Sequence, residues 1–488
     1  MTGHEQIVGL CHGVFDVVHP GHLAHFKEAK SKCDLLVVSI TSDRFVNKGP
    51  SRPFFDEAKR ANFLASLEVV DYVFISDSPS AVESINLVKP RMYFKGSDYS
   101  NLDSDLTGKI YEEKIAVEKH DGNLCFTSGF TSSSTSIINS VLTPTDSPIR
   151  IWTDNFKKLY TPIEVSFWID KLKDLHVSVI GETIIDGYTN CSALAKSSKD
   201  PILAFQILET NKYFGGILAI ADSCSNWAKS TEVISVHGAD YALHSKDIKA
   251  EYSYSLNCIE VPDRPTIYKH RFVDNSSGAR VFEYYDFDAA PIEEKTEELL
   301  IRKIVSSCED TKVVVAADYG HGMMTKNVIT SIEKLKCFLA VNVQSNAGNR
   351  GFNTVSKWNQ LDLLCLNGSE LELEFRDKNL NYKEVVPSIM KSKGASFAVV
   401  TLGGKGMMVF GKSGQHCSIP ALATKVVDKV GAGDSVLAIS ALLASQNAPI
   451  EIIALLCSVV ASHEISHLGH VKGLSTIDMK RFVSSLLG

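Results

Sequence analysis

Two short stretches of the sequence carry residue types that suit work on phosphate groups. The first is CHGVFDVVHPGH, residues 11–22, which ends in His19 and His22 three positions apart. Two histidines at i and i+3 at the start of a helix share one face, and the free N–H groups there favour anions. Imidazoles so placed can stabilise charge on the α-phosphate and leaving pyrophosphate of a nucleoside triphosphate. The alternative is a pair of solvated histidines at a helix cap.

The second stretch is DKVGAGDS, residues 428–435, directly before the helical pattern SVLAISALLASQ. The small residues Gly431, Ala432 and Gly433 let the backbone approach a phosphate closely, so their N–H groups can form an anion hole. Asp434 is then placed to act as a general base toward a substrate hydroxyl. A turn with an N-capping aspartate would give the same pattern, and both interpretations stay open here.

The residues of both stretches must be positioned by strands and helices, which alternate along the sequence. From Ile7 to about Ser140, β-rich runs such as DLLVVSIT and DYVFIS alternate with helical patterns such as PGHLAHFKEAK. This predicts βαβ units on a parallel sheet, with ligands at the carboxyl ends of the strands. His19 and His22 lie at such an end. A second α/β region starts with HVSVIG at 176–181 and continues to the end of the sequence.

Two segments break the alternation. Residues 141–160 contain two prolines and several turn formers without a clear period, so we place a linker there, between domains at 1–140 and 161–488. Residues 251–288 are aromatic and β-branched in short alternating runs around an NSSG turn. They predict the strands of an antiparallel flap or lid on the second α/β body.

Composition excludes several classes of protein. The 488 residues are 44% hydrophobic and 22% charged, which is typical of a globular protein and argues against disorder. The net charge of −7 argues against nucleic acid as a partner. Eleven cysteines without a CxxC pair predict reduced thiols. Without a signal-like N-terminus or a long apolar run, we expect a cytoplasmic protein that does not bind membranes.

The first stretch resembles the signature of the cytidylyltransferase-like nucleotidyltransferases. SITSDRFVNKGPSRPFFDEAKR, YFKGSDYS and the serine-rich SSSTSII at 132–138 follow in the order of that family, so the resemblance covers about residues 7–140. It implies in-line attack of a sugar-1-phosphate oxygen on the α-phosphorus, with Mg²⁺ bridging the triphosphate. Class I aminoacyl-tRNA synthetases share HxGH, but this sequence lacks a KMSKS-like loop.

The resemblance also assigns site residues in the N-terminal domain. It implies that His19, His22 and Lys48 hold the developing charge. Lys48 suits a triphosphate as a point charge, and the helix that opens at the serine-rich stretch suits the β- and γ-phosphates. The nucleotide or phosphate ligands expected here are Gly13, Phe15, Arg52, Arg60, Ser133, Ser134 and Thr135.

The second stretch resembles the C-terminal signature of the ribokinase-like (PfkB) sugar kinases, over roughly residues 175–475. CLNGSELE at 365–372 matches the NxxE pattern, which implies that Asn367 and Glu370 organise Mg²⁺ and phosphate. TLGGKGMMVF at 401–410 matches the turn beside the ATP site, which places Gly403 there. The resemblance makes Asp434 the base that removes the proton of an anomeric hydroxyl while ATP donates its γ-phosphate.

Other matching pieces concern the sugar. GETIIDGY at 181–188 implies that Asp186 binds sugar hydroxyls, and Gly215 with Gly216 would let a pyranose press against the backbone. Within the family, KSSKDPI, RPTIYKHRF and ADYGHGM point to the heptose-phosphate kinases. Lys269 and Arg271 can pair with a distal phosphate on the sugar, and a solvated strand face is the alternative.

Together the two halves resemble the bifunctional heptose-phosphate kinase and heptose-1-phosphate nucleotidyltransferases. The predicted architecture is α/β, with an N-terminal Rossmann-like HxGH domain followed by a ribokinase-like domain with a small β lid. This domain order is expected to be the reverse of the usual one, and the loop at 341–353 departs from the family pattern. Expected ligands are sugar phosphates, Mg²⁺, ATP as phosphoryl donor and ATP or CTP as nucleotidyl donor.

Three functions remain open from the sequence. The first is formation of an ADP-heptose-like product by both halves acting in turn. The second is synthesis of a CDP-linked sugar or polyol by the same fold. The third makes one half a non-catalytic binding module. The resemblance further suggests a homodimer formed through the kinase lid.

Overall fold

The computed structural model describes residues 6–46, 52–96, 109–128, 147–197, 199–246, 248, 253–423, 426–467, 469 and 473–487. The chain forms two compact units. The first unit contains residues 1–162 and 480–488, and the second contains residues 163–479. The predicted boundaries did not anticipate that the C-terminal residues join the first unit.

The first unit is built on a parallel sheet, as the alternating pattern predicts. Its described strands are β1 (Val8–Gly13), β2 (Leu35–Thr41), β3 (Tyr72–Ser76), β4 (Met92–Gly96) and β5 (Asn123–Thr127). They lie in the order β3-β2-β1-β4-β5, and each neighbouring pair is parallel. The strand order reverses between β1 and β4. In open α/β sheets, ligands bind at the carboxyl ends beside such a reversal.

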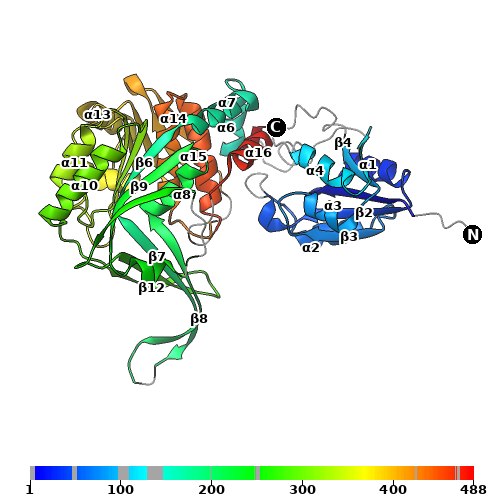
Figure 1. Ribbon diagram of the computed structural model, residues 1–488, viewed down its shortest axis with the longest axis horizontal. Coiled ribbons are helices and arrows are strands. Elements are labelled where there is room, and N and C mark those ends of the chain that lie inside the picture. Colours follow the sequence, from blue (N-terminus) through cyan, green and yellow to red (C-terminus); the bar gives the residue numbers. More distant parts are fainter. Residues whose placement is uncertain are drawn as a thin grey trace, which may run out of the picture. The chain divides into compact units, whose positions relative to one another are not determined.

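Helices cover both faces of this sheet (Figure 1). Apolar side chains of α1 (Pro20–Lys30) and α2 (Glu57–Ala65) pack into one core with β1 and β2. Those of α3 (Val82–Val88) and α4 (Lys109–Glu118) pack into the core on the other face. Of these helices, α1 is the one whose residues, PGHLAHFKEAK, were named as a helical pattern from the sequence.

The predicted linker contains a helix, α6 (Pro148–Lys157). Proline at its first position suits a helix start, because that N–H would have no partner within the helix. Trp152 stacks on Phe156 with ring centroids 5.0 Å apart, and Phe156 contacts Tyr160. This spacing of four gives the segment the helical period that the prediction failed to detect.

The second unit has a large sheet at its centre. Its described strands are β6 (His176–Gly181), β9 (Ser230–Gly238), β10 (Ser255–Val261), β13 (Val313–Asp318), β14 (Phe338–Val343), β15 (Leu363–Asn367), β16 (Phe397–Thr401), β17 (Met407–Phe410) and β18 (His416–Ile419). Their order is β10-β9-β6-β13-β14-β15-β16-β17-β18, parallel except for the last two pairs. β13, VVVAAD, is buried throughout, as expected for a strand covered on both faces.

Two layers of helices cover this sheet (Figure 1). The helices on one side are α10 (Glu294–Ser307), α11 (Lys326–Glu333), α12 (Gly368–Phe375) and α13 (Tyr382–Lys393). Those on the other are α8 (Ile217–Ser225), α14 (Ala432–Ser445) and α15 (Ile450–Glu464). The unit also contains α7 (Pro162–Asp170) and α9 (Tyr241–Ser245), and α16 (Thr476–Leu487) continues into the first unit.

A separate sheet forms the lid. Its described strands are β7 (Thr183–Lys196), β8 (Leu203–Gly216), β11 (Ile267–Asp274) and β12 (Arg280–Asp286), in the order β12-β11-β7-β8. The prediction of a lid is confirmed, but its extent was wrong. β10 pairs with β9 in the large sheet, half of the lid comes from residues 183–216, and β11 pairs with β7 in parallel. Alternating patterns identify strands but not their partners.

Candidate active sites

The two histidines of the first stretch form the N-terminal cap of α1. His19 is the N-cap residue, and its Nδ1 accepts a hydrogen bond from the Gly21 N–H at 3.1 Å. His22 Nδ1 accepts from the His19 N–H at 3.4 Å, so the two side chains complete a capping box. Their ring centroids lie 3.9 Å apart. For His19 the cap and the phosphate interpretation are therefore compatible, because the cap uses only the Nδ1 of its ring.

This cap fixes the tautomer of both rings. A neutral imidazole that accepts at Nδ1 carries its proton at Nε2. Burial lowers the pKa of His19, which favours the neutral form, and the side chain is only 7% exposed. Among the described residues, the Nε2 of His19 has no hydrogen-bond partner. His19 is thus a preorganised N–H donor at the start of α1.

The loops next to these histidines are tied together by buried ionic groups. Asp16 accepts from the backbone N–H groups of Phe54 and Phe55 at 2.7 and 2.9 Å, and Arg52 Nη1 lies 3.5 Å from it. Phe15 has a positive φ of 48° and packs edge-on against the His22 ring at 5.3 Å. A Cβ on Gly13 would lie 3.0 Å from the Phe15 ring.

Arg60 has a different role from the predicted one. Its guanidinium donates to the carbonyls of Phe55 and Thr41 at 3.0 and 2.9 Å and to Asp43 at 2.6 Å. The side chain is 2% exposed. Because its donors are used inside the fold, Arg60 joins loops rather than binding a phosphate. Four other predicted residues, Lys48, Ser133, Ser134 and Thr135, lie outside the described residues.

The second stretch forms the beginning of α14. Gly431 is the N-cap residue with φ 86°, a conformation that favours glycine, and Ala432 is the first helical residue. Gly433 is exposed, and a Cβ there would have no atom within 4 Å. From Ser435 onward the helix is buried. The first turn of a helix leaves N–H groups without a partner inside the helix, and such groups are what the anion-hole prediction requires.

Asp434 lies in the first turn of this helix and accepts two side-chain hydrogen bonds. Tyr319, which follows β13, donates its hydroxyl to Oδ1 of Asp434 at 3.2 Å. Gln344, which follows β14, donates its amide to the same oxygen at 2.9 Å. Both donors come from carboxyl ends of neighbouring central strands, where parallel sheets place their ligands. The carboxylate is therefore fixed by two separate loops.

The lid supplies a buried ion pair. Asp186 of β7 binds Arg271 of β11 at 2.6 Å, and both side chains are at most 12% exposed. A Cβ on Gly215 would lie 2.1 Å from Oδ2 of Asp186, so only glycine leaves room for this carboxylate. The next residue, Gly216, has φ 55° and caps α8. The two glycines thus leave room for Asp186, the residue that is predicted to bind the sugar.

Lys269 interacts electrostatically with two acidic side chains, Asp186 and Asp434. Burial lowers the pKa of Lys269, whereas the charges of Asp186 and Asp434 raise it. Its ammonium lies 5.4 Å from the ring centroid of Tyr285 and 5.9 Å from that of Tyr319. The solvated strand face considered from the sequence is excluded for Lys269 and Arg271, since both are less than 8% exposed.

The NxxE pair forms a capping box at the start of α12. Asn367 Oδ1 accepts from the Glu370 N–H at 2.8 Å, and the Glu370 carboxylate accepts from the Asn367 N–H at 2.8 Å. Burial raises the pKa of Glu370 to about 7, and the Asp434 charge adds to the rise. Within the described ranges, no group of three or more His, Cys, Asp or Glu side chains could hold a metal. Gly403 lies exposed in the turn after β16.

Comparison with known families is decisive for the second unit. The model of the pfkB family of carbohydrate kinases matches residues 174–477, more than half of the chain. The chain belongs to the pfkB carbohydrate kinases. The cytidylyltransferase-like model matches residues 10–148, the region that contains His19 and His22. Both families are transferases, so the predictions of a transferase and of two α/β domains in this order are confirmed.

Curated relatives of this pfkB-family chain match a smaller part of it. The "Bifunctional protein HldE" of Paramagnetospirillum magneticum is 45% identical over 97 residues, which is 20% of each chain. That of Geobacter metallireducens is 38% identical over 135 residues, which is 27% of this chain and 26% of the relative. The chain thus spans about a fifth to a quarter of these relatives. Their aligned parts give no support to the predicted reversal of domain order, and we do not retain it.

Solved structures show the fold of the pfkB unit. Phosphofructokinase-2 from Escherichia coli, in complex with potassium, aligns with a TM-score of 0.51 at 17% identity, covering 64% of this chain and 99% of that chain. A putative ribokinase from Agrobacterium tumefaciens aligns with a TM-score of 0.50 at 14% identity, covering 64% and 98%. At such identities the likeness concerns the fold alone.

Three residues of the candidate kinase site were not predicted from the sequence: Glu182, Tyr319 and Gln344. Glu182 is 1% exposed and accepts from the N–H groups of Tyr319 and His321, each at 3.1 Å. Burial raises the pKa of Glu182 to about 7, and the charge of Asp318 adds to the rise. A signal was present, because ADYGHGM and VNVQSN each place polar residues directly after an apolar strand.

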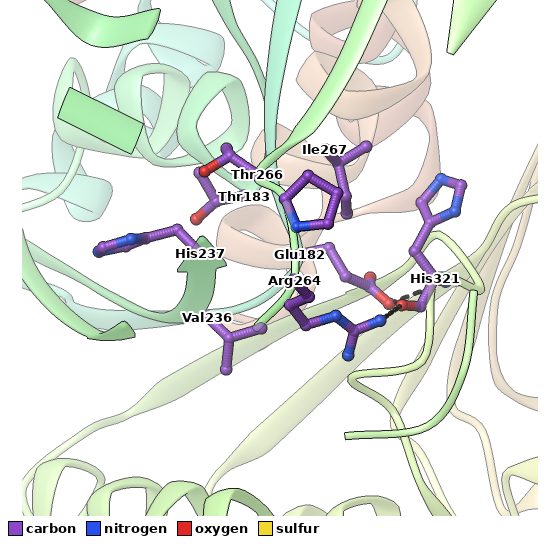
Figure 2. A pocket seen from close by; sticks show the side chains of 9 residues that line it. Glu182, Thr183, Val236, His237, Arg264, Thr266, Ile267 and His321 are labelled. Carbon is purple, nitrogen blue, oxygen red and sulfur yellow. Dashed lines mark hydrogen bonds between the residues drawn. The ribbon is translucent and has the colours of Figure 1, made fainter. Parts of the chain in front are cut away.

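A small cavity lies next to His321, in the segment after β13 (Figure 2). Glu182, His237, Arg264 and His321 contribute to its lining, and Arg264 donates to the His321 carbonyl at 3.2 Å. Its volume of about 20 Å³ has room for about one water molecule. The cavity is thus too small for a nucleotide or a sugar.

Proposed function

We propose that the protein is a bifunctional enzyme of nucleotide-sugar synthesis. The kinase unit phosphorylates a sugar at its anomeric hydroxyl with ATP, and the N-terminal unit transfers a nucleotidyl group to a sugar 1-phosphate. The observation that carries this proposal is Asp434, which is fixed by Tyr319 and Gln344 at the open N-terminus of α14. A positioned carboxylate beside an anion hole suits deprotonation of a hydroxyl during phosphoryl transfer.

In the proposed kinase step, Asp434 takes the proton of the anomeric hydroxyl. That oxygen forms a bond to the γ-phosphorus while the bond to the β,γ-bridging oxygen breaks, and its electron pair leaves with ADP. The N–H groups around Gly431 and Gly433 stabilise the charge on the phosphoryl oxygens. Asp186 orients the sugar hydroxyls, because Arg271 and Gly215 hold its carboxylate in place.

The proposed sugar carries a distal phosphate, as heptose 7-phosphate does. Lys269 and Arg271 supply two buried cations, and Arg271 is already paired with Asp186. The charge of Lys269 is therefore the one best placed to meet a substrate phosphate. The name of the curated relatives agrees with two activities in one protein, and the matched share of their length leaves the sugar itself as part of our proposal.

In the proposed transferase step, a sugar-1-phosphate oxygen forms a bond to the α-phosphorus of a nucleoside triphosphate. The bond to the pyrophosphate oxygen breaks, and pyrophosphate leaves with the electron pair. His19 donates its Nε2 proton to the phosphate oxygens as a hydrogen bond, without giving it up. His22, Lys48, Arg52 and the 133–135 stretch complete this proposed site. ATP as donor gives an ADP-linked sugar, and CTP is the alternative.

Magnesium fits the acidic groups of the kinase unit. Glu370 is a buried carboxylate whose pKa is raised, so a nearby cation would stabilise its ionised form. Mg²⁺ needs only one or two protein carboxylates when substrate phosphates and water supply the remaining ligands. When bound, it would neutralise phosphate charge, and Glu370 with Asn367 would hold it there.

The setting of the enzyme is also part of the proposal. No helix among the described residues is long and apolar enough to cross a membrane. We propose a cytoplasmic enzyme that acts on small sugar phosphates and nucleotides and forms a homodimer through the lid sheet.

The test measures both half-reactions of the purified protein. Pyrophosphate release is followed with each of the four nucleoside triphosphates and a panel of sugar 1-phosphates that includes heptoses. ADP release is followed with ATP and the corresponding sugar phosphates. We expect D434N to abolish only ADP formation and H19A to abolish only pyrophosphate release. Activity with CTP alone would move the product to a CDP-linked compound, and silence of either half would make that unit a binding module.

A further inference from the structure

The asparagine-rich loop after β14, which departs from the family pattern, is tied to the loop after β13. The side-chain amides of Asn346 and Asn349 both donate to the backbone carbonyl of Tyr319, at 2.7 and 2.8 Å. Gly320, the next residue, has φ 73°, and a Cβ there would lie 2.3 Å from Nδ2 of Asn349. The asparagines therefore hold the turn that carries Tyr319.

The same loop is closed on itself by Asn353. Its amide donates to the Asp318 and Gln344 carbonyls at 3.0 and 3.1 Å, and to the Asp318 carboxylate at 3.2 Å. Asn353 is 8% exposed and Asp318 is fully buried. The Asn353 side chain thus holds the backbone of Asp318, which precedes Tyr319, and the backbone of Gln344. It therefore supports both donors to Asp434.

We infer that Gln344 is the positioning residue of the general base, and that the Gln344–Asn353 loop serves to hold its amide against Oδ1 of Asp434. The inference rests on the proposed kinase function. Tyr319 and Gln344 donate to the same oxygen, so together they set the rotation of the carboxylate. Both donors are neutral side chains. A neutral donor orients a carboxylate while lowering its basicity less than a cation would.

Other titratable groups also influence Asp434. The groups whose pKa values respond to its charge are Lys269, Tyr319, Cys365 and Glu370. They lie on or next to the β11, β13, β15 and α12 elements. A substitution at Gln344 replaces none of these four residues, and Gln344→Leu shows which part of a change in the pH–rate profile does not come from a new charge at position 344.

The test compares Gln344→Glu and Gln344→Leu with the wild type in the ADP-release assay. Gln344→Glu puts a carboxylate where Asp434 has a donor, and like charges at this separation oppose ionisation. We expect the acidic limb of the kcat profile to move to higher pH by about one unit. Gln344→Leu removes the donor without adding a charge. We expect about a tenfold fall in kcat with KM for ATP unchanged and no such shift.

Controls separate this inference from the proposed function and from misfolding. Gln415→Glu makes the same chemical change at an exposed position and should leave the profile unchanged. Pyrophosphate release and the thermal transition report whether the variants fold. If the wild type forms no ADP with any sugar phosphate, the proposed kinase function fails. If the wild type is active and D434N is not, but both Gln344 variants keep the wild-type kcat and pH profile, the positioning role alone is overturned.

Discussion

The two candidate sites achieve preorganisation in opposite ways. His19 and His22 are oriented by hydrogen bonds to backbone groups within four residues of the chain. Asp434 is oriented by Tyr319 and Gln344, which are 115 and 90 positions away in sequence. The first site depends on one helix cap and the second on the meeting of three segments. A site of the first kind can be recognised from a short motif, whereas one of the second kind cannot.

The difference also concerns charge. At the histidine site the His19 ring is a neutral donor, because burial lowers its pKa. The kinase site contains four charged side chains, Asp186, Lys269, Arg271 and Asp434. It also contains the buried carboxyl groups of Glu182 and Glu370, whose pKa values are raised to about 7. Tertiary packing must hold these charges close together in spite of their desolvation. The second site should therefore respond more to remote substitutions and to pH.

The largest effect is expected at the local site. His19→Asn keeps an oxygen that can cap α1, because asparagine is a good N-cap residue, but it removes the Nε2 donor. We expect pyrophosphate release to fall by about 10²–10³-fold with little change in thermal stability. His19→Ala should lose the same activity and about 1 kcal/mol of stability in addition. Full activity of the asparagine variant would show that the ring serves only as a cap.

A smaller effect is expected from Gly215→Ala, which acts on Asp186, a residue of another lid strand. The new Cβ would lie 2.1 Å from Oδ2 of Asp186, so the carboxylate must turn away from Arg271. We expect kcat/KM for the sugar to fall by about tenfold or more, together with a loss of about 1–3 kcal/mol in stability. Kinase assays over a range of sugar concentrations and calorimetry measure both.

Gly433→Ala is the matched control for that prediction. Its added methyl group meets no protein atom within 4 Å, so stability should be retained while ATP turnover falls through the loss of space for the phosphate. Equal destabilisation by both alanine variants would contradict the specific conflict with Asp186.

The smallest effect is a dependence of stability on pH through Glu182. The pKa of this carboxyl group is raised to about 7 by burial and by Asp318. The folded protein thus binds its proton more tightly than the unfolded chain does, and it loses stability as pH rises from about 4.5 to about 7. Glu182→Gln cannot titrate and should be less stable, because its NH2 group faces backbone donors.

Calorimetry of the whole protein between pH 5 and pH 7.5 tests this prediction. The difference in stability between wild type and Glu182→Gln should narrow as pH rises, by at most about 1.4 kcal/mol per pH unit. A constant difference over this range would show that Glu182 does not titrate there.

Much of the fold followed from local patterns. The runs before His19 and after Leu35 became β1 and β2, and PGHLAHFKEAK became α1. The GAGD stretch became the start of α14, as its small residues suggested. The linker and the lid were predicted less well. α6 was missed, and β10 left the predicted lid for the large sheet, because strand partners depend on contacts far along the chain.

The candidate site residues were likewise predicted where a local motif marked them and missed where distant segments meet. The motifs located His19, His22 and Asp434, and the structure brings Asp186, Lys269 and Arg271 into one buried group. Arg60 was wrong as a phosphate ligand, because its donors bind carbonyls inside the fold. Tyr319 and Gln344 were missed, since tyrosine and glutamine after apolar strands have no distinctive spacing relative to Asp434.

By itself, the sequence determined the α/β class of both units, the helix caps that carry the two motifs, and the residue types available for phosphate chemistry. These depend on periodicity and on hydrogen bonds between near neighbours in the chain. Only the tertiary structure decided that Gly215 makes room for Asp186 and that two loops meet on one oxygen of Asp434. Those features depend on distances between distant segments, and such distances are fixed by packing of the whole unit.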